Sequence, residues 1–549
     1  MAQQRQTTDR RKFLAGAAAG VGGAAFGGTL LRAGSAYAAS TPPPSCGDPT
    51  LTPAVTVGPA DQQYPDMVSA LNTRFVAAPG SVYVVNAPSQ IAPIVTSAVS
   101  SHKRLTVRGG GHCFEDFVYN SDVQTIIDLT NMNRVYYEPK LNAIAIESGA
   151  ILLDVYKKLY ETWGMVVPGG MCYSVCVGGH VPGGGWGWLV RRNGLIVDHL
   201  YAVEVVVVGA SGTVSTILAT RDASDPNREL WWAHTGGGGG NFGVVTRYYF
   251  RSPNATGTDP RYLLPRPPAK VLFDLCAWNL NSLSVTDLTR LVQNYGNWHA
   301  ANIAADNPNR FVVSTLQACH KSNGQVNLTA HVDAGAPNAQ QLLNDYVAYM
   351  KSGVAAPLFE VQTQYPWLQF ARMTGTTNPL ANDPTLRGKQ KSAFMKAAFT
   401  STQAAAIYKH LTRTDINNPN IFLLFTPYGG ATSAVGQTDT AIPHRTAAYK
   451  TMWSTQWASP ADDAANLAWS RQCYQEIFAD TGGVPVPNDA SDGCYVNYAD
   501  GDISDPNFNQ SSSSWHDLYY KDNYPRLQQV KKKYDPSNFF QHRQSVELP

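Results

Sequence analysis

Three glycine-rich segments constrain the fold of this chain more than any other feature. Glycines 109–111 follow a short apolar stretch, glycine recurs through residues 169–187, and five consecutive glycines occupy 236–240. Flexible linkers are also rich in glycine, but the third segment lies between two tryptophans and the β-branched run 244–246. Glycine permits backbone conformations and close approaches that a side chain prevents. The three segments therefore predict ordered loops that surround an extended ligand.

The sequence around these loops predicts a mixed architecture of helices and strands. A strand–helix–strand pattern covers residues 81–107 and repeats up to the apolar run 202–208, which indicates one α/β domain from about 61 to 250. From 261 to about 494, apolar strands alternate with helices, and we expect a second domain with an antiparallel sheet backed by helices. A lysine-rich helix at 526–533 belongs to a tail that we expect to return to the first domain.

The charge balance limits the classes of partner. Charged residues make up 15% of the chain, compared with about 25% in typical soluble proteins, and 42 basic against 40 acidic residues leave a net charge of +2. Binding to nucleic acid or to an anionic membrane requires a positive excess that this chain lacks. We therefore expect small-molecule partners, no nucleic acid and no stable membrane association.

Residues 1–38 have the features of a twin-arginine signal peptide. Arg10 and Arg11 stand in the string DRRKFL, a weakly apolar alanine- and glycine-rich stretch follows, and a small-residue cleavage site ends at Ala38. A transmembrane anchor is the alternative, but this stretch is too rich in glycine and ends in a cleavage-like site. We expect export of a folded protein from a bacterial cell. Eight cysteines over 549 residues do not indicate a disulfide scaffold.

Two cofactor hypotheses follow from the motifs and fit poorly. No glycine segment has the strand, G-x-G-x-x-G, helix and distant carboxylate of a nicotinamide-dinucleotide site, so a dehydrogenase of that type is disfavoured. Cys172, Cys176 and His180 are spaced four residues apart, as zinc ligands on one helix face would be. Their surroundings are glycine-rich and poorly helical, and no fourth ligand adjoins them, so we expect no metal.

Several strings together resemble a known family over nearly all of the mature chain. Residues 107–116 read VRGGGHCFED, residues 495–500 read YVNYAD and residues 530–540 read VKKKYDPSNFF, and these accompany the glycine clusters at 167–187 and 236–240. They resemble the berberine-bridge-enzyme-like branch of the vanillyl-alcohol-oxidase flavoproteins, and within it a group of actinobacterial oxidases that tailor antibiotics. The resemblance implies an α+β fold with a two-part FAD-binding domain of the PCMH type and a substrate domain whose antiparallel sheet is backed by helices.

The resemblance also implies domain boundaries and site residues. The FAD-binding domain would span 61–255, the substrate domain 256–495, and a C-terminal segment, 496–549, would complete the FAD domain. In that group a histidine bonds to the flavin 8α carbon and a cysteine 60 residues later bonds to C6, which implies bonds to His112 and Cys172; Cys113 and Cys176 are near alternatives. The other implied cofactor-binding residues are Arg108, Gly109, Gly110, Gly111, Gly170, Val177, Gly178, Gly179, His180, Gly184, Gly185, Gly240, Asn241, Val245, Tyr498 and Asn538.

The implied activity is oxidation of an alcohol. Such a reaction needs a base beside the hydroxyl and an acceptor for hydride. The resemblance places substrate-side tyrosines at Tyr498 and Tyr428, and we expect Tyr498 to be the base, assisted by a positive or hydrogen-bonding group, with Tyr428 as a candidate. The substrate would be a sugar or polyketide hydroxyl, with oxygen reoxidising the flavin to give hydrogen peroxide. Flavin-dependent ring closure or desaturation is the alternative, and a carbohydrate-binding protein without activity is a third.

Overall fold

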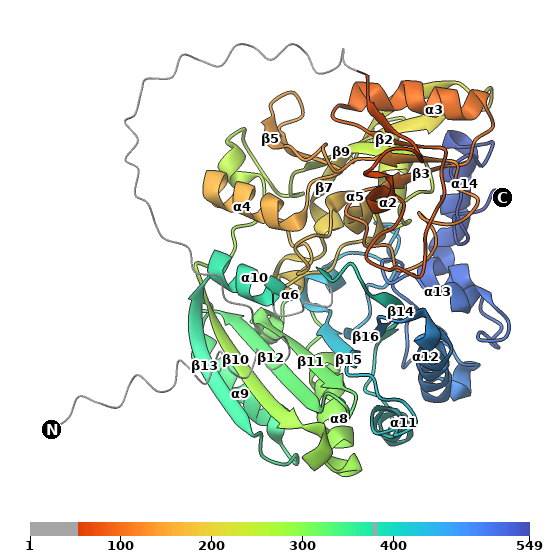
Figure 1. Cartoon of the computed structure of the whole chain (residues 1–549). Coiled ribbons are helices and arrows are strands. Elements are labelled where there is room, and N and C mark those ends of the chain that lie inside the picture. Colours follow the sequence, from red (N-terminus) through yellow and green to blue (C-terminus); the bar gives the residue numbers. More distant parts are fainter. Residues whose placement is uncertain (1–52, 377–381) are drawn as a thin grey trace, which may run out of the picture. The chain divides into compact units, whose positions relative to one another are not determined.

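The computed structural model describes residues 53–376 and 382–549, so the expected signal peptide, 1–38, and Cys46 lie outside the described residues. The described elements form three sheets and their helices (Figure 1). The strands are β1 Val55–Val57, β2 Ser81–Val84, β3 Leu105–Arg108, β4 Thr125–Asp128, β5 Val135–Glu138, β6 Ala143–Glu147, β7 Leu200–Val208, β8 Val214–Thr220, β9 Val244–Phe250, β10 Lys270–Asn279, β11 Val312–Cys319, β12 Gln325–Asp333, β13 Phe359–Pro366, β14 Arg387–Met395, β15 Ile421–Pro427 and β16 Tyr449–Trp457.

The helices cover these sheets, and none among the described residues is both long and apolar enough to cross a membrane. They are α2 Tyr64–Met67, α3 Ile91–Ser100, α4 Leu152–Trp163, α5 Val177–His180, α6 Val190–Asn193, α7 Arg228–Ala233, α8 Val285–Ala301, α9 Ala339–Lys351, α10 Trp367–Thr376, α11 Ser401–Leu411, α12 Asp463–Ile477, α13 Trp515–Tyr520 and α14 Tyr524–Tyr534. Helix α4 shows how the sequence directs this: Leu152, Val155, Tyr156 and Leu159 form its buried face. Gly164 then ends the helix with a φ of 67°.

The first sheet has the predicted strand–helix–strand unit. Its order is β1-β2-β4-β3, with β4 parallel to both β2 and β3, and α3 connects β2 to β3. Apolar residues of α3, including Ile91 and Val95, pack with Leu105 and Ile127 in one core cluster. Strand β3 ends at Arg108, so this packed unit fixes the start of the first glycine segment.

The second sheet corrects the prediction that this pattern repeats. Its order is β5-β6-β9-β7-β8, and every pairing in it is antiparallel. Short connections join β5 to β6 and β7 to β8, and such hairpins force an antiparallel arrangement. Strand β7 lies between β8 and β9 and is buried along almost its whole length, which explains its continuous apolar sequence.

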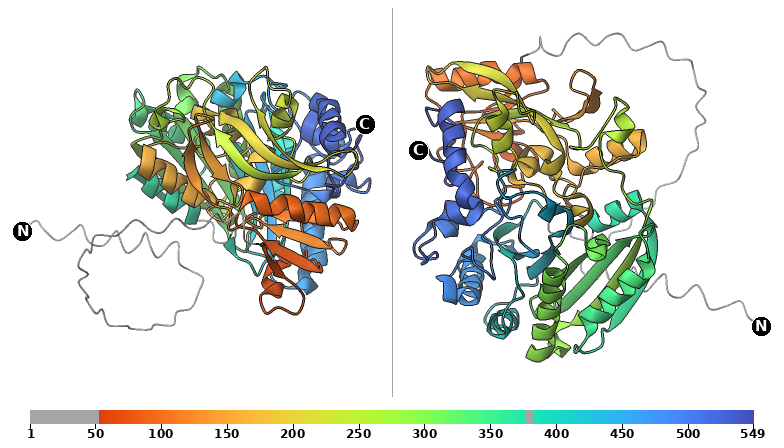
Figure 2. Two further views of the ribbon diagram at one scale, coloured as in Figure 1. Left: turned by 90° about the horizontal axis from the view of Figure 1, so that it is seen from above. Right: turned by 180° about the vertical axis from the view of Figure 1, so that it is seen from behind.

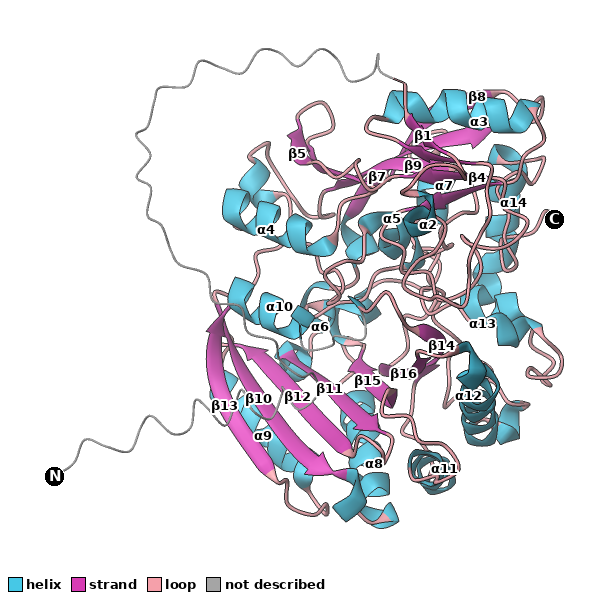
Figure 3. Ribbon diagram, in the orientation of Figure 1, coloured by secondary structure: helices cyan, strands magenta, loops and turns pink. Residues whose placement is uncertain are grey.

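The third sheet confirms the expected antiparallel sheet backed by helices. Its seven strands follow the order β13-β10-β12-β11-β15-β16-β14. Helices α8 and α9 cover one face, as Figure 3 and the rear view in Figure 2 show. In β15 and β16, alternate residues such as Leu423 and Trp453 are buried in the main core, whereas Phe422 and Met452 belong to a separate small cluster. The sheet thus has one face for the core and one face that remains available for a site.

The C-terminal tail packs against the segment around the third glycine cluster. Arg526 of α14 pairs with Glu229 of α7 at 2.6 Å, and Lys531 donates a hydrogen bond of 2.7 Å to the carbonyl of Asn241. Figure 1 shows α14 beside the part of the molecule that contains the first two sheets, and α13 below it, near β14. The α+β class is confirmed. The three domain boundaries stay predictions, because residues 49–549 form one compact unit.

Candidate active site

A cavity of about 380 Å³ brings the three glycine segments together. Volumes of this order are typical of cofactor and small-molecule sites. Its wall also includes the expected anchors, the YVNYAD turn and the β14–β16 face of the third sheet. The predicted residues that line it are Arg108, Gly109, Gly110, Gly111, His112, Gly170, Cys172, Gly178, Gly179, His180, Gly240, Asn241, Val245 and Tyr498.

Five predicted residues do not line this cavity: Val177, Gly184, Gly185, Asn538 and Tyr428. Val177 is completely buried in the main core. Gly185 acts indirectly, because its N–H donates a hydrogen bond of 3.1 Å to the hydroxyl of Tyr495, a cavity residue. Tyr428, the expected partner of the base, is fully buried against Phe394, with ring centroids 5.2 Å apart. Phe394 also contacts the cavity residue Tyr495, and the role assigned to Tyr428 stays a prediction.

His112 is neutral and oriented by a hydrogen-bond relay. Burial lowers its pKa to about 4. Its Nε2 lies 2.7 Å from the Ser174 hydroxyl, which in turn donates its only hydrogen to the side-chain oxygen of Asn382. Ser174 must then accept a hydrogen bond from Nε2–H, so Nδ1 carries the free lone pair. A neutral imidazole with a free nitrogen at a cavity wall is a competent nucleophile.

Three cysteines line the cavity, but their surroundings differ. The thiol of Cys176 accepts a hydrogen bond of 2.9 Å from the N–H of Gly110. Burial raises the pKa of Cys113 to about 12, and the neighbouring backbone N–H groups of Glu115 and Phe117 oppose this shift. Burial raises the pKa of Cys172 to about 11, and the nearby Lys450 opposes this shift. Cys113 and Cys176 are thus engaged with backbone groups, which favours Cys172 as the reactive thiol.

The zinc hypothesis receives no support from the described residues. Cys176 and His180 instead accept backbone hydrogen bonds, in the case of His180 from the N–H of Gly170 at 3.0 Å. Within the described chain, the group of three whose ligand atoms lie within 4.8 Å of one another is Asp274, Cys276 and Glu360, on β10 and β13. All seven cysteines in that part of the chain are free.

The first glycine loop has free backbone donors that suit a diphosphate. Among the described residues, the N–H groups of Gly111, His112 and Cys113 donate to no other group of the chain, whereas that of Gly110 donates to Cys176. Consecutive N–H groups that point into a cavity bind anions without a side-chain cation. The cations in this wall are already paired, Arg108 with Asp128 at 2.9 Å and Arg387 with Asp463 at 2.6 Å. The loop therefore fits the diphosphate of FAD.

The glycines serve two purposes, of which the sequence analysis stated one. A Cβ on Gly178 would lie 2.6 Å from the Ser148 carbonyl oxygen, and one on Gly110 would lie 2.5 Å from that of Ser174. These glycines are required because protein backbone packs against them. Gly179 lines the same cavity, but a Cβ on Gly179 would have no atom within 4 Å. Only the second kind leaves room for a ligand.

Tyr498 lies beside a buried lysine that the sequence analysis missed. Lys450 donates a hydrogen bond of 3.0 Å to the Tyr498 hydroxyl. Its ammonium nitrogen also lies 4.3 Å from the centroid of the Tyr498 ring and 4.5 Å from that of Trp186. Burial lowers the pKa of Lys450 to about 7 and raises the pKa of Tyr498. A lysine amid the aromatic residues of strand 449–457 was the available signal, since such a position normally takes an apolar residue.

One face of the third sheet forms part of the cavity wall. Phe422, Leu424 and Met452 give an apolar floor, and Gln390 and Ser454 add polar groups at its edge. The side-chain oxygen of Gln390 is buried and has no hydrogen-bond partner among the described residues. Buried polar atoms are nearly always paired, so this oxygen is suited to a hydroxyl donor from a bound molecule.

The fold and the site together define an FAD-dependent oxidoreductase. Residues 79–217 match the family described as FAD binding domain, and residues 494–547 match the family described as Berberine and berberine like. Aclacinomycin-N/aclacinomycin-A oxidase of Streptomyces galilaeus is 44% identical, covering 98% of this chain and 98% of the relative. The hexose oxidase of Chondrus crispus is 30% identical, covering 88% of this chain and 93% of the relative. The chain belongs to the berberine-bridge-enzyme-like family of flavoprotein oxidases.

Solved structures agree with this assignment. CrmK, a flavoenzyme involved in shunt product recycling in caerulomycin biosynthesis, is 42% identical with a TM-score of 0.89, covering 91% of this chain and 100% of that chain. The glycopeptide hexose oxidase DBV29, solved with teicoplanin, is 40% identical with a TM-score of 0.85, covering 90% and 99%. Both similarities extend over the FAD-binding and the substrate-binding parts of the expected architecture.

Proposed function

We propose that this protein carries FAD bonded to both His112 and Cys172 and oxidises an alcohol of a sugar-bearing or polyketide natural product. The observation that carries the proposal is the meeting of these two nucleophiles, the free amide groups of the glycine loop and Tyr498 in one cavity. The loop 109–113 would bind the diphosphate, and His112 and Cys172 would bond to the ring system.

The chain's own residues supply the acid–base chemistry. The substrate hydroxyl gives its proton to the Tyr498 oxygen, and the positive charge of Lys450 stabilises the tyrosinate that this role needs. Because the pKa of Lys450 is lowered to about 7, the Lys450–Tyr498 pair loses its first proton near neutral pH. FAD held by the loop 109–113, His112 and Cys172 would supply the hydride acceptor, and oxygen would take up the electrons as hydrogen peroxide.

A bulky substrate with an apolar face is supported by two observations. The cavity floor of Phe422, Leu424 and Met452 offers a surface for a flat ring system. Relatives are named for oxidation of aclacinomycins and of hexoses, and DBV29 was solved with teicoplanin. Oxidative ring closure or desaturation is the second candidate; it would use the same hydride acceptor and yield a product without a new carbonyl group.

One experiment tests the proposal at two levels. The denatured polypeptide is weighed by mass spectrometry, and the native protein is screened for peroxide release with hexoses, oligosaccharides and antibiotic glycosides. We expect an added mass of one FAD, peroxide in proportion to substrate, and a new carbonyl or carboxyl group in the product. Protein without a covalent adduct would overturn the attachment, and a product with a new ring or double bond would favour the second candidate.

We further propose that residues 1–38 direct export through the twin-arginine route. Arg10 and Arg11 in the string DRRKFL, with the cleavage-like site that ends at Ala38, support this. Fractionation of cells that express the chain should place it outside the cytoplasm. Replacing both arginines with lysine should retain it inside, with FAD still bonded.

A further inference from the structure

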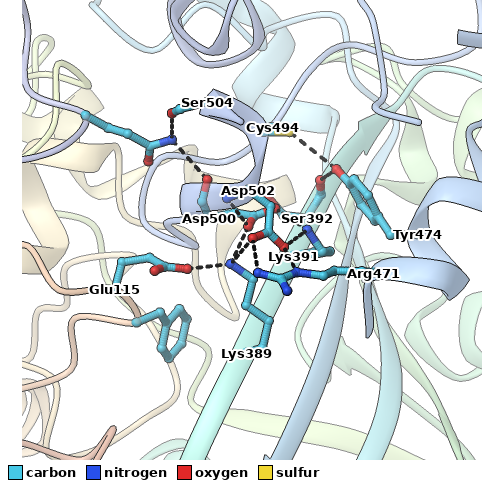
Figure 4. Close-up of polar contacts among 12 residues, drawn as sticks. Glu115, Lys389, Lys391, Ser392, Arg471, Tyr474, Cys494, Asp500, Asp502 and Ser504 are labelled. Carbon is cyan, nitrogen blue, oxygen red and sulfur yellow. Dashed lines mark hydrogen bonds and ion pairs between the residues drawn. The ribbon is translucent and has the colours of Figure 1, made fainter. Parts of the chain in front are cut away.

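Six charged side chains form a network in which five are buried and Arg471 is partly exposed (Figure 4). Three are acidic, Glu115, Asp500 and Asp502, and three are basic, Lys389, Lys391 and Arg471, so the formal charges cancel. The Lys389 and Lys391 side chains are each 2% exposed. Solvent therefore screens the charge–charge interactions of these two lysines only weakly.

Lys389 is the member that joins two separate segments. Its ammonium nitrogen lies 2.6 Å from a carboxylate oxygen of Glu115 and 2.6 Å from one of Asp500. Glu115 follows His112 by three residues in the first glycine loop, and Asp500 follows Tyr498 by two residues in the YVNYAD turn. One side chain from strand β14 thus contacts the segment with the cofactor anchor and the segment with the base.

Lys391 differs from Lys389 in one respect that allows a test. It pairs with Asp500 at 2.8 Å and with Asp502 at 2.9 Å, and no pairing with Glu115 is present. Both lysines lie on the same face of β14, two residues apart, while Gln390 between them faces the cavity. Lys391 therefore secures only the turn that carries Tyr498.

Neutral contacts reinforce the same connection. Asn72 donates to the carbonyl of Phe114 at 2.8 Å and accepts from the N–H of Gly388 at 2.9 Å, so it too joins the glycine loop to β14. Phe114 stands between His112 and Glu115 in the sequence. Its ring contacts the Tyr498 ring, with centroids 5.9 Å apart. His112, Glu115 and Tyr498 are consequently positioned by one rigid arrangement.

We propose that Lys389 is a positioning residue for covalent attachment: through Glu115 it holds the His112 loop in the place where the histidyl bond forms, and through Asp500 it aligns Tyr498. This inference rests on the proposed attachment of FAD to His112. In that attachment a bond from the imidazole nitrogen to the flavin methyl carbon replaces one N–H and one C–H bond, and oxygen takes both hydrogens as hydrogen peroxide. The bond needs a nucleophile placed to within a fraction of an ångström.

The test measures each covalent bond separately. In a Cys172→Ala background the histidyl bond is the one that remains, and in a His112→Ala background the cysteinyl bond is the one that remains. Glu115→Gln, Lys389→Met and Lys391→Met are introduced into both backgrounds, and the fraction of denatured polypeptide that carries FAD is measured by mass. Lys521→Met is the matched control, because Lys521 also pairs with a buried carboxylate, Asp492, at 2.5 Å, away from this network.

We expect Glu115→Gln and Lys389→Met to lower the histidyl fraction by about tenfold or more, because ångström-scale misplacement of a reacting group costs that much. In the His112→Ala background, the cysteinyl fraction should equal that of the parent for every variant. Lys391→Met and Lys521→Met should also leave the histidyl fraction unchanged. An equal histidyl fraction in Glu115→Gln and in the parent overturns the inference, as does equal loss of both bonds, since that would indicate general misfolding. If the parent chain carries no covalent FAD, the proposed function itself fails, and this outcome is distinct from the first two.

Discussion

The ammonium group of Lys450 donates a hydrogen bond to the hydroxyl of Tyr498 and also lies over the face of the same ring. Both contacts favour a negative charge on the tyrosine oxygen, and both come from one side chain of β16. The cost is a buried amine whose pKa falls to about 7. We therefore expect the proposed base, Tyr498, to become active as the pH rises through about 7.

Lys450→Met is expected to remove this dependence. In the parent enzyme the pair is fully protonated below about pH 7 and singly deprotonated above it, so the rate of flavin reduction should rise through about pH 7 and then level off. Without the lysine, ionisation must come from Tyr498 alone, whose pKa burial raises above its usual value of 10. The pH at which the rate of flavin reduction rises should then shift above 10. At neutral pH the rate of flavin reduction should fall about 10² to 10⁴-fold. Stopped-flow traces at several pH values give both results, and Lys450→Arg, which keeps a charge, serves as the comparison.

Tyr498→Phe should slow flavin reduction by orders of magnitude while FAD stays bonded, because the ring and its packing remain and the proton acceptor is lost. Tyr428→Phe tests the second predicted tyrosine: Tyr428 is fully buried and does not line the cavity, so we expect a smaller loss than for Tyr498→Phe. Near-normal reduction by Tyr498→Phe would reject its role as the base.

His112→Ala and Cys172→Ala should each leave one covalent bond, so either single variant should still add the mass of one FAD to the denatured polypeptide. The double variant should add none. Retention of the adduct in the double variant would point to Cys113 or Cys176, which line the same cavity.

Substitution of the two adjacent glycines of α5, Gly178 and Gly179, should affect different properties: stability in the first case and FAD content in the second. Gly178→Ala places a methyl group 2.6 Å from the Ser148 carbonyl oxygen, and we expect a loss of about 1–3 kcal/mol in the free energy of unfolding. Gly179→Leu directs its side chain into the cavity, so the fold should remain and FAD content should fall. Thermal unfolding and the flavin-to-protein absorbance ratio separate the two effects, and equal behaviour of the two variants would show that the cavity is not the cofactor site.

Gln390→Leu should raise KM about tenfold with a smaller change in kcat. Its buried side-chain oxygen has no partner among the described residues, and one hydrogen bond to substrate is worth about 1–2 kcal/mol. Steady-state kinetics with the best substrate from the peroxide screen measure this. An unchanged KM would place the substrate elsewhere on the β14–β16 face.

Residue patterns predicted the local parts of this molecule better than its long-range parts. The strand–helix–strand unit 81–108 and the helices α4, α8 and α14 were evident from periodicity, because each depends on nearby residues. The antiparallel order of β5 to β9 was missed, since β9 lies between β6 and β7 and its pairing with β6 joins residues about one hundred positions apart. Strands β14 and β16 were missed as well, because Lys389, Lys391 and Lys450 interrupt their apolar pattern.

The same limit explains the outcome for the site. His112, Cys172 and the glycines belong to contiguous strings, so a family resemblance located them, and fourteen of the predicted residues line the cavity. Lys450 acts through a contact with Tyr498 across 48 residues, and no local pattern pairs these two. Tyr428 also belongs to a recognisable string, but its side chain is fully buried and does not line the cavity, so its assigned role stays a prediction.

The contact of Lys531 with the Asn241 carbonyl has a consequence for biosynthesis. The wall that contains the third glycine segment is secured by residues from the last turns of α14, and Phe540, Gln541 and His542 line the cavity themselves. These residues follow the third glycine segment by about 300 positions in the chain. A nascent chain cannot complete this wall of the cavity before residue 542 has been synthesised, so we expect FAD capture to follow synthesis of that segment.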